Sequence, residues 1–193
     1  MKKKLFVLTL AAALMTTAAA RADWTSGTES RFYTEGGESA ARIALTAQQN
    51  LKTAISTADG TAEFYFQYGN TADEDAFALK LPAYIQDGTV KSALVSVTPI
   101  VDTGNGRRFY LLNTGAPGGC LLVSYSKGKY QTAFDASSVE GTYEKASIEV
   151  QKKQLILHLT DSAGKKSSHI LTYDKKSNVF TAEDALVSTE TKS

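Results

Sequence analysis

The sequence of 193 residues has a single cysteine, only three prolines and almost no net charge. One cysteine cannot form an internal disulfide, so a hydrophobic core has to stabilise the fold. With 21 basic and 20 acidic side chains, the chain lacks the basic excess of nucleic-acid-binding domains, and we expect no nucleic-acid partner. Hydrophobic residues make up 42% of the chain, which excludes intrinsic disorder of the whole, because disordered chains combine low hydrophobicity with high net charge.

Long apolar runs are also scarce, and the clearest one lies at the N-terminus. Lys2, Lys3 and Lys4 precede the apolar segment Leu5–Met15, and small residues then lead to Ala20-Arg21-Ala22. This order is typical of a secretory signal peptide with an A-x-A cleavage site, whereas a membrane anchor needs about 20 apolar residues. We therefore expect residues 1–22 to be a signal peptide, cleaved after Ala22 or alternatively after Ala20, and the protein to be exported to a bacterial periplasm or exterior.

The remaining chain is long enough for one domain with a substantial core. Without residues 1–22 it carries 17 basic and 20 acidic side chains, a net charge of −3. It has no second apolar stretch of spanning length, so we expect no membrane span in the mature chain. We predict a loose lead-in over residues 23–38, with a short strand near Arg31–Tyr33, then one β-rich domain over 39–186 and a polar tail over 187–193.

Residues 39–57 carry the one helical pattern of the sequence. Apolar residues recur there at spacings of three and four, polar residues occupy the other side, and Gly60 follows as a stop signal. The spacing predicts an amphipathic helix, although Ile43-Ala44-Leu45 is also compatible with the start of a strand. The apolar positions are Ala44, Ala47, Leu51, Ala54, Ile55 and Ala58.

The rest of the chain has the pattern of an antiparallel β protein. About ten short runs rich in β-branched and aromatic residues alternate with turn clusters, which predicts a meander of hairpins. The fold class expected is therefore α+β and mainly β, with one N-terminal helix followed by the hairpins. The expected hairpins include Cys120–Ser126 with Lys129–Asp135, Tyr143–Gln151 with Gln154–Thr160, and Ser167–Tyr173 with Asn178–Ala182.

Two groups of residues have the chemistry of hydrolases. Asp102-Thr103-Gly104 follows two apolar residues, like the active-site turn of an aspartic protease, but that chemistry needs a second carboxylate about 3 Å away. The same residues suit a hairpin turn, which is the interpretation we favour. Cys120, with His158 or His169 as base, is a possible thiol nucleophile, but a lone cysteine beside apolar residues more often behaves as a buried hydrophobic residue.

No metal or cofactor site is expected. Asp73, Glu74 and Asp75 place three acids in one loop, but the loop lacks the alternating ligands and the glycine of a calcium loop, so we interpret these acids as solvated. No phosphate-binding loop, dinucleotide fingerprint or zinc spacing is present.

The segment from Val90 to Asp135 contains a glycine-containing loop, a strand and a second glycine-rich turn. Thr103-Gly104-Asn105-Gly106 supplies the first turn and Gly115-Ala116-Pro117-Gly118-Gly119 the second. This order resembles the integrin-type (FG-GAP or VCBS-like) repeats of bacterial exported proteins, and the resemblance implies strands and export. In that alignment the first acidic ligand falls on Val101 and the closing glutamate on Phe109, so the resemblance does not imply calcium binding.

These observations favour a non-catalytic exported module that binds an unidentified protein or glycan through its glycine-rich loops. Alternatives are a small protein inhibitor of an extracellular enzyme, or a hydrolase that uses Asp102 or Cys120. We expect the loop Asn113–Gly119 and the turn Asp102–Arg108 to form one contact surface. Its candidate residues are Arg107, Arg108, Asn113, Gly115, Ala116, Pro117, Gly118 and Gly119. A stacking platform could come from the aromatic residues Phe64, Tyr65, Phe66, Tyr68, Phe109, Tyr110, Tyr125 and Tyr130.

Overall fold

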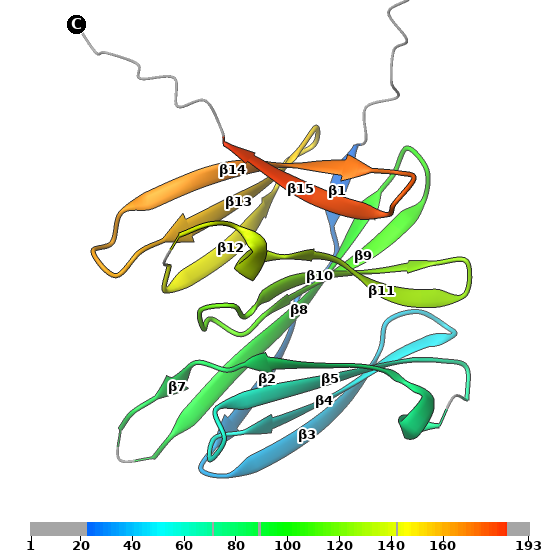
Figure 1. Cartoon of the computed structure of the whole chain (residues 1–193). Coiled ribbons are helices and arrows are strands. Elements are labelled where there is room, and N and C mark those ends of the chain that lie inside the picture. Colours follow the sequence, from blue (N-terminus) through cyan, green and yellow to red (C-terminus); the bar gives the residue numbers. More distant parts are fainter. Residues whose placement is uncertain (1–22, 71, 89, 142, 185–193) are drawn as a thin grey trace, which may run out of the picture.

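The computed structural model describes residues 23–70, 72–88, 90–141 and 143–184. These residues form fifteen strands, all paired antiparallel, in three sheets (Figure 1). The prediction of a mainly β fold built from antiparallel hairpins is therefore confirmed. No helix among the described residues has the length and apolar character needed to cross a bilayer.

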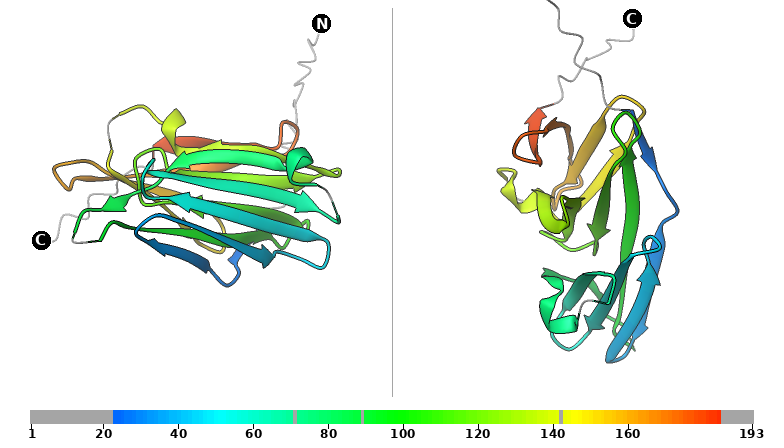
Figure 2. Two further views of the ribbon diagram at one scale, coloured as in Figure 1. Left: turned by 90° about the horizontal axis from the view of Figure 1, so that it is seen from below. Right: turned by 90° about the vertical axis from the view of Figure 1, so that its right-hand side faces the viewer.

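The central sheet has seven strands and is organised around β8 (Ser92–Asp102). One edge of β8 pairs with β1 and β2, and the other pairs with β7 and β9; β10 and β11 then complete the sheet. The side view in Figure 2 shows that β8 and its blue neighbours extend along both of the other sheets. The bounds are β1 Trp24–Ser26, β2 Ser30–Glu35, β7 Ile85–Gln86, β9 Arg107–Asn113, β10 Cys120–Ser126 and β11 Lys129–Asp135.

Two four-stranded sheets cover the central sheet, and in Figure 1 one lies above it and one below. The lower sheet has the order β3-β4-β5-β6 and the upper sheet the order β12-β13-β14-β15. The lower strands are β3 Glu38–Ala44, β4 Gln49–Ser56, β5 Thr61–Tyr68 and β6 Phe77–Pro82. The upper strands are β12 Lys145–Val150, β13 Leu155–Thr160, β14 Lys166–Asp174 and β15 Val179–Asp184. Two short 3-10 turns, η1 (Asp73–Asp75) and η2 (Ala136–Ser138), complete the elements.

Strands β9 and β10 are apolar on both faces because each face belongs to a different core. Phe109 and Leu111 of β9 pack into the upper core, against the upper sheet, while Tyr110 and Leu112 pack into the lower core, against the lower sheet. A strand that is buried on both sides has a continuous apolar sequence instead of an alternating one. The layered structure thus explains the runs FYLL and CLLV.

The helix predicted over residues 39–57 is wrong, because this segment forms the hairpin of β3 and β4. Four alternate residues of β4 are buried, but two of them, Gln49 and Thr53, are polar, so the two-residue period is not visible as an apolar pattern. Gln49 can be buried because its Oε1 accepts a hydrogen bond of 2.5 Å from the Tyr110 hydroxyl. The alternative strand start at Ile43-Ala44-Leu45 was closer to the structure, since Ile43 and Ala44 end β3.

The segment 23–38 is more ordered than the loose lead-in that the sequence suggested. It supplies β1 and β2 to the central sheet and begins β3. Trp24 is buried in the upper core, where its ring centroid lies 5.7 Å from that of Phe109 and 5.6 Å from that of Phe180. The predicted signal peptide over 1–22 and the tail over 187–193 lie outside the described residues.

Candidate functional site

The upper sheet leaves part of the central sheet uncovered. Tyr33 of β2 and Leu94 of β8 are cross-strand partners, and they point away from the lower core because their neighbours Phe32 and Val95 point into it. In Figure 1 this part of β2 and β8 lies beside the lower sheet and away from the upper one. The two side chains therefore have no covering layer.

Exposed apolar side chains gather at this place. Tyr33 is 57% exposed, Tyr84 52% and Leu94 47%, and Val90 is exposed at the end of the same β2–β8 ladder. These are four of the five large hydrophobic side chains found exposed among the described residues. Isolated exposed apolar residues are common on soluble proteins, but a cluster of them is typical of an interaction surface.

The cluster borders a groove of about 550 Å³ between the central and upper sheets, which we call the waist groove. Tyr33, Tyr84 and Leu94 line one side of it, and Lys145 and His158 of the upper sheet line the other. Asn113 lies at the junction, where its Nδ2 donates to the Ala146 carbonyl at 3.4 Å. The volume lies within the range of about 300–1,000 Å³ that small-ligand sites occupy.

The loop Asn113–Gly119 lies at one end of this groove, but it is packed more tightly than the sequence suggested. Thr114 and Ala116 are buried, and the Thr114 hydroxyl donates to the Pro82 carbonyl. Gly115 joins Asn113 and Thr114 in lining the groove. Of the predicted loop residues, Ala116, Pro117, Gly118 and Gly119 do not line it, and Ala116 is only 6% exposed.

The glycines of this loop have structural reasons to be there. Gly115 and Gly118 have φ angles of 73° and 71°, in the left-handed region that side chains with a Cβ rarely adopt. A Cβ on Gly119 would come within 1.8 Å of Thr114 Oγ1. Their presence in the sequence is therefore explained by the backbone of a packed turn and needs no ligand.

Arg107 and Arg108 lie at the opposite end of β9 from Asn113. Six residue steps along a strand separate Arg107 from Asn113, a distance of about 20 Å. The structure therefore does not bring the two predicted halves of the contact surface together. Instead, Arg107 and Arg108 line a different cleft, together with Tyr68 and Tyr125.

Asp102 has the environment of a structural turn residue. It is 1% exposed, its Oδ1 accepts from the Gly104 N–H at 3.0 Å, and its Oδ2 accepts from Asn105 Nδ2 at 2.5 Å. Its carboxylate is thus occupied by its own turn, as expected of an aspartate that stabilises a hairpin. A second carboxylate sharing a proton with Asp102 is not found among the described residues.

Cys120 is buried in the upper core, and burial raises the pKa of its thiol to about 12. A thiol nucleophile needs the opposite shift, because the thiolate is the reactive form.

Both histidines have polar partners other than the buried thiol. His169 hydrogen-bonds Ser167 and pairs with Asp184, and His158 lies on the face of β13 opposite to the core. Within the described residues, no three side chains of His, Cys, Asp or Glu lie close enough to hold a metal ion.

One chain of polar groups near the groove has the composition of a catalytic triad. His158 Nδ1 lies 2.9 Å from Ser168 Oγ, and its Nε2 lies 2.9 Å from Glu149 Oε2. Hydrogen bonds from Gln151 and His158 lower the pKa of Glu149. Acyl transfer also needs free N–H donors placed to stabilise an oxyanion. His158 lies on β13, which pairs with β12 on one side and β14 on the other, so the backbone N–H groups of this strand are used in the sheet. We interpret this chain as a polar cross-strand network that fixes one wall of the groove.

No protein-family model matches the chain, and neither the curated proteins nor the solved structures contain one significantly similar to it. The resemblance of residues 90–135 to integrin-type repeats therefore stays a prediction.

The sequence reasoning missed Tyr33, Tyr84 and Leu94. The sequence does contain a signal for Tyr33. Phe32 and Tyr33 are adjacent, and adjacent residues in a strand point to opposite faces of the sheet. Only one of the two can face a given core. The structure shows that the second face at this position has no cover, which the sequence of β2 alone does not state.

Proposed function

We propose that this protein is an exported, non-catalytic module that binds another protein through the waist groove. The observation that carries the proposal is the cluster of Tyr33, Tyr84 and Leu94 beside a groove. Aromatic residues are enriched at the centres of protein interfaces, where charged residues are depleted. Aliphatic Leu94 favours an apolar protein side chain as the contacting group over a sugar hydroxyl.

The character of the opposite wall supports the same proposal. Lys145 lies across the groove from the tyrosines, so a partner segment with an apolar anchor flanked by a carboxylate would complement both walls. Asn113 and Thr114 add hydrogen-bonding groups at one end. A few polar groups around an apolar centre are typical of sites that orient a partner. The burial of Cys120 and the turn contacts of Asp102 remove the support for the hydrolase alternative.

Site-specific photo-crosslinking tests this proposal. A benzoyl-phenylalanine is introduced at Tyr33 or Tyr84, and at Ala78 as a control on the exposed outer face of the lower sheet. In envelope preparations of the producing cell, we expect the same protein adduct from positions 33 and 84 and none from 78. Leu94→Lys should abolish the adduct, because a charge would then have to be desolvated in the contact.

Equal adducts at all three positions would contradict the proposal, as would adducts that persist in Leu94→Lys. A self-adduct together with dimeric sedimentation would show that the groove binds a second copy of the chain. Retention on immobilised glycans that is lost in Leu94→Lys would assign the groove to a sugar.

Export is the second part of the proposal and rests on the sequence of residues 1–22. N-terminal sequencing of the protein recovered from the medium or the periplasm should begin at Asp23, or at Arg21 if cleavage follows Ala20. An exported protein that still begins at Met1 would contradict it.

A further inference from the structure

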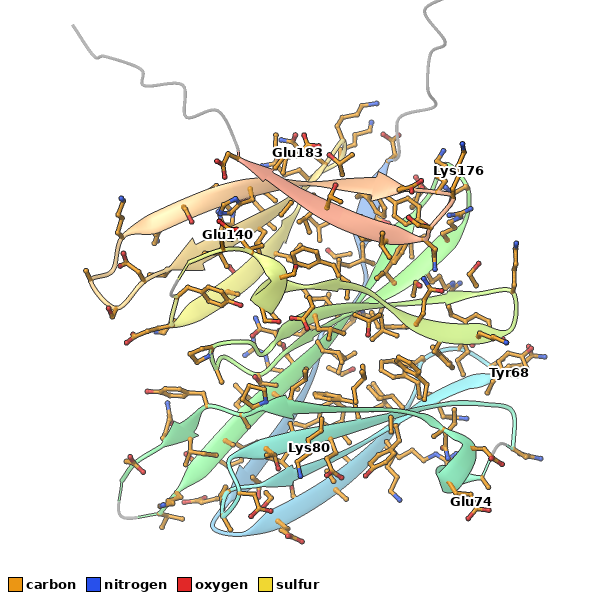
Figure 3. The ribbon with its side chains drawn as sticks, viewed as in Figure 1. Tyr68, Glu74, Lys80, Glu140, Lys176 and Glu183 are labelled. Carbon is orange, nitrogen blue, oxygen red and sulfur yellow. The ribbon has the colours of Figure 1, made fainter. Side chains whose placement is uncertain are left out.

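A second cleft, at the opposite end of the molecule, brings together cations and exposed aromatic rings. It has a volume of about 500 Å³ and lies where turns of the central sheet meet the lower sheet. Tyr68 ends β5 of the lower sheet, and Gln48 lies in the turn between β3 and β4. Arg107 and Arg108 begin β9 of the central sheet, and Lys127 lies in the turn between β10 and β11. We call it the arginine–tyrosine cleft; Figure 3 shows Tyr68 at this right-hand end of the molecule.

The aromatic floor of the cleft is held rigidly by the lower core. Tyr68 and Tyr125 stack with their ring planes 10° apart and their centroids 5.5 Å apart. Tyr125 in turn packs on Tyr130 at 4.7 Å, and Tyr130 packs on the buried Phe66 at 5.1 Å. The Tyr68 hydroxyl also donates to Gln48. Tyr68 nevertheless stays 42% exposed, so a preorganised ring is presented to a ligand at a low cost in side-chain entropy.

The cations of the cleft are not neutralised by carboxylates. No acidic residue is among those that line it. The Arg107 guanidinium is held in place by Tyr173. It donates a hydrogen bond to the Tyr173 hydroxyl and lies over the Tyr173 ring, 5.4 Å from its centre. Arg108 is exposed, and among the described residues its side chain has no hydrogen bond or ion pair. Asp102, the cross-strand partner of Arg107, accepts hydrogen bonds from its own turn.

We propose that the arginine–tyrosine cleft binds an acidic saccharide, with a sugar ring stacked on Tyr68 and its anionic substituent paired with Arg108. The planar guanidinium binds carboxylate, sulfate and phosphate groups through two parallel hydrogen bonds, and Lys127 adds a second positive charge. The net charge of −3 expected for residues 23–193 disfavours a nucleic acid, since that ligand needs an extended basic surface. This site is independent of the waist groove and does not rest on its proposed function.

Isothermal titration of the purified protein with defined oligosaccharides tests the proposal. The probes are tetragalacturonate, a heparin-derived tetrasaccharide and a phosphorylated tetrasaccharide, with neutral maltotetraose and inorganic phosphate as references. We expect at least one acidic tetrasaccharide to bind, maltotetraose not to bind, and phosphate alone to bind much more weakly. Binding should weaken as salt increases, because ion pairing at an exposed site is screened.

Variants separate a specific site from diffuse attraction. Arg108→Gln and Tyr68→Ala should each weaken binding by about tenfold or more, because the first removes the charge-assisted hydrogen bonds to the anion and the second removes the stacked ring. Lys166→Gln, at an exposed position of β14, removes the same charge elsewhere and should leave binding unchanged. Circular dichroism verifies that each variant is folded.

Three results would overturn the proposal. The first is that none of the three acidic tetrasaccharides binds. The second is that Lys166→Gln weakens binding as much as Arg108→Gln, which would indicate non-specific charge attraction. The third is that phosphate binds as tightly as the tetrasaccharides, which would reduce the cleft to a simple anion site without a role for Tyr68.

Discussion

The two faces of the central sheet differ in how far they are covered. On β8, Ala93, Val95 and Val97 face the lower core and are all buried, whereas Leu94 on the opposite face is 47% exposed. Further along the same strand, Ile100 is buried again, under the upper sheet. One strand therefore passes from a covered to an uncovered position on the same face. This comparison shows that the waist groove exists because the upper sheet ends before it reaches Leu94.

The largest expected effects test whether the two cores unfold together. Phe109→Ala in the upper core and Phe64→Ala in the lower core should each lower the free energy of unfolding by about 3–5 kcal/mol, because both side chains are fully buried. Urea unfolding followed by circular dichroism and by the fluorescence of Trp24, the sole tryptophan, should give coincident transitions in both variants.

Coincidence is expected because β9 and β10 contribute side chains to both cores. If Phe64→Ala shifted the transition seen by circular dichroism and left that of Trp24 in place, the two cores would be independent folding units. The central sheet would then not couple them.

A smaller effect concerns the polar residues that distinguish the lower core. Tyr110→Phe should lower the free energy of unfolding by about 1–3 kcal/mol, because it leaves the buried Gln49 Oε1 without its hydrogen-bond donor. Gln49→Leu should cost a similar amount, and the double variant should cost less than the sum of the two, since neither partner is then left unpaired. Strict additivity in urea unfolding would show that the bond contributes nothing to this core.

The same two residues explain what sequence reasoning could and could not recover. The hairpins from Cys120 onward were predictable because turn residues such as Lys127-Gly128 separate runs of strand-forming residues. The hairpin of β3 and β4 was not, because burial of Gln49 depends on Tyr110, which lies 61 residues later. Local spacing instead favoured a helix, since Leu51, Ala54 and Ile55 also satisfy a three-and-four period.

The candidate sites were predictable to a similar extent. Arg107, Arg108 and Asn113 do line clefts, but their positions at opposite ends of β9 follow only from knowing that the segment between them is one extended strand. Leu94 could not be recognised as exposed, because the sequence of β8 does not state where a distant sheet stops. Exposure is a property of the packing of layers and is encoded only indirectly in any one strand.

An effect confined to alkaline pH tests the burial of Cys120 in the upper core. Burial raises the thiol pKa from 9.0 to about 12, so the folded protein keeps a proton that the unfolded chain loses. The resulting stabilisation is fully present below pH 9 and is lost as the pH rises towards 12. Between pH 8 and 11, the free energy of unfolding measured with urea should therefore fall more steeply with pH for the wild type than for Cys120→Ala. Parallel pH profiles would mean that the thiol is accessible to solvent.

The smallest expected effect tests the central claim, that Leu94 and its neighbours lie on an uncovered face of the central sheet. The decisive measurement is the free energy of unfolding of Leu94→Lys by urea, with Val95→Lys as the matched variant one residue away. Leu94→Lys should change the stability by no more than about 0.5 kcal/mol, as surface substitutions do, while Val95→Lys should destabilise the protein by several kcal/mol or prevent folding. A loss of about 2 kcal/mol or more in Leu94→Lys would contradict the account, because it would show that this face is already covered in the free protein.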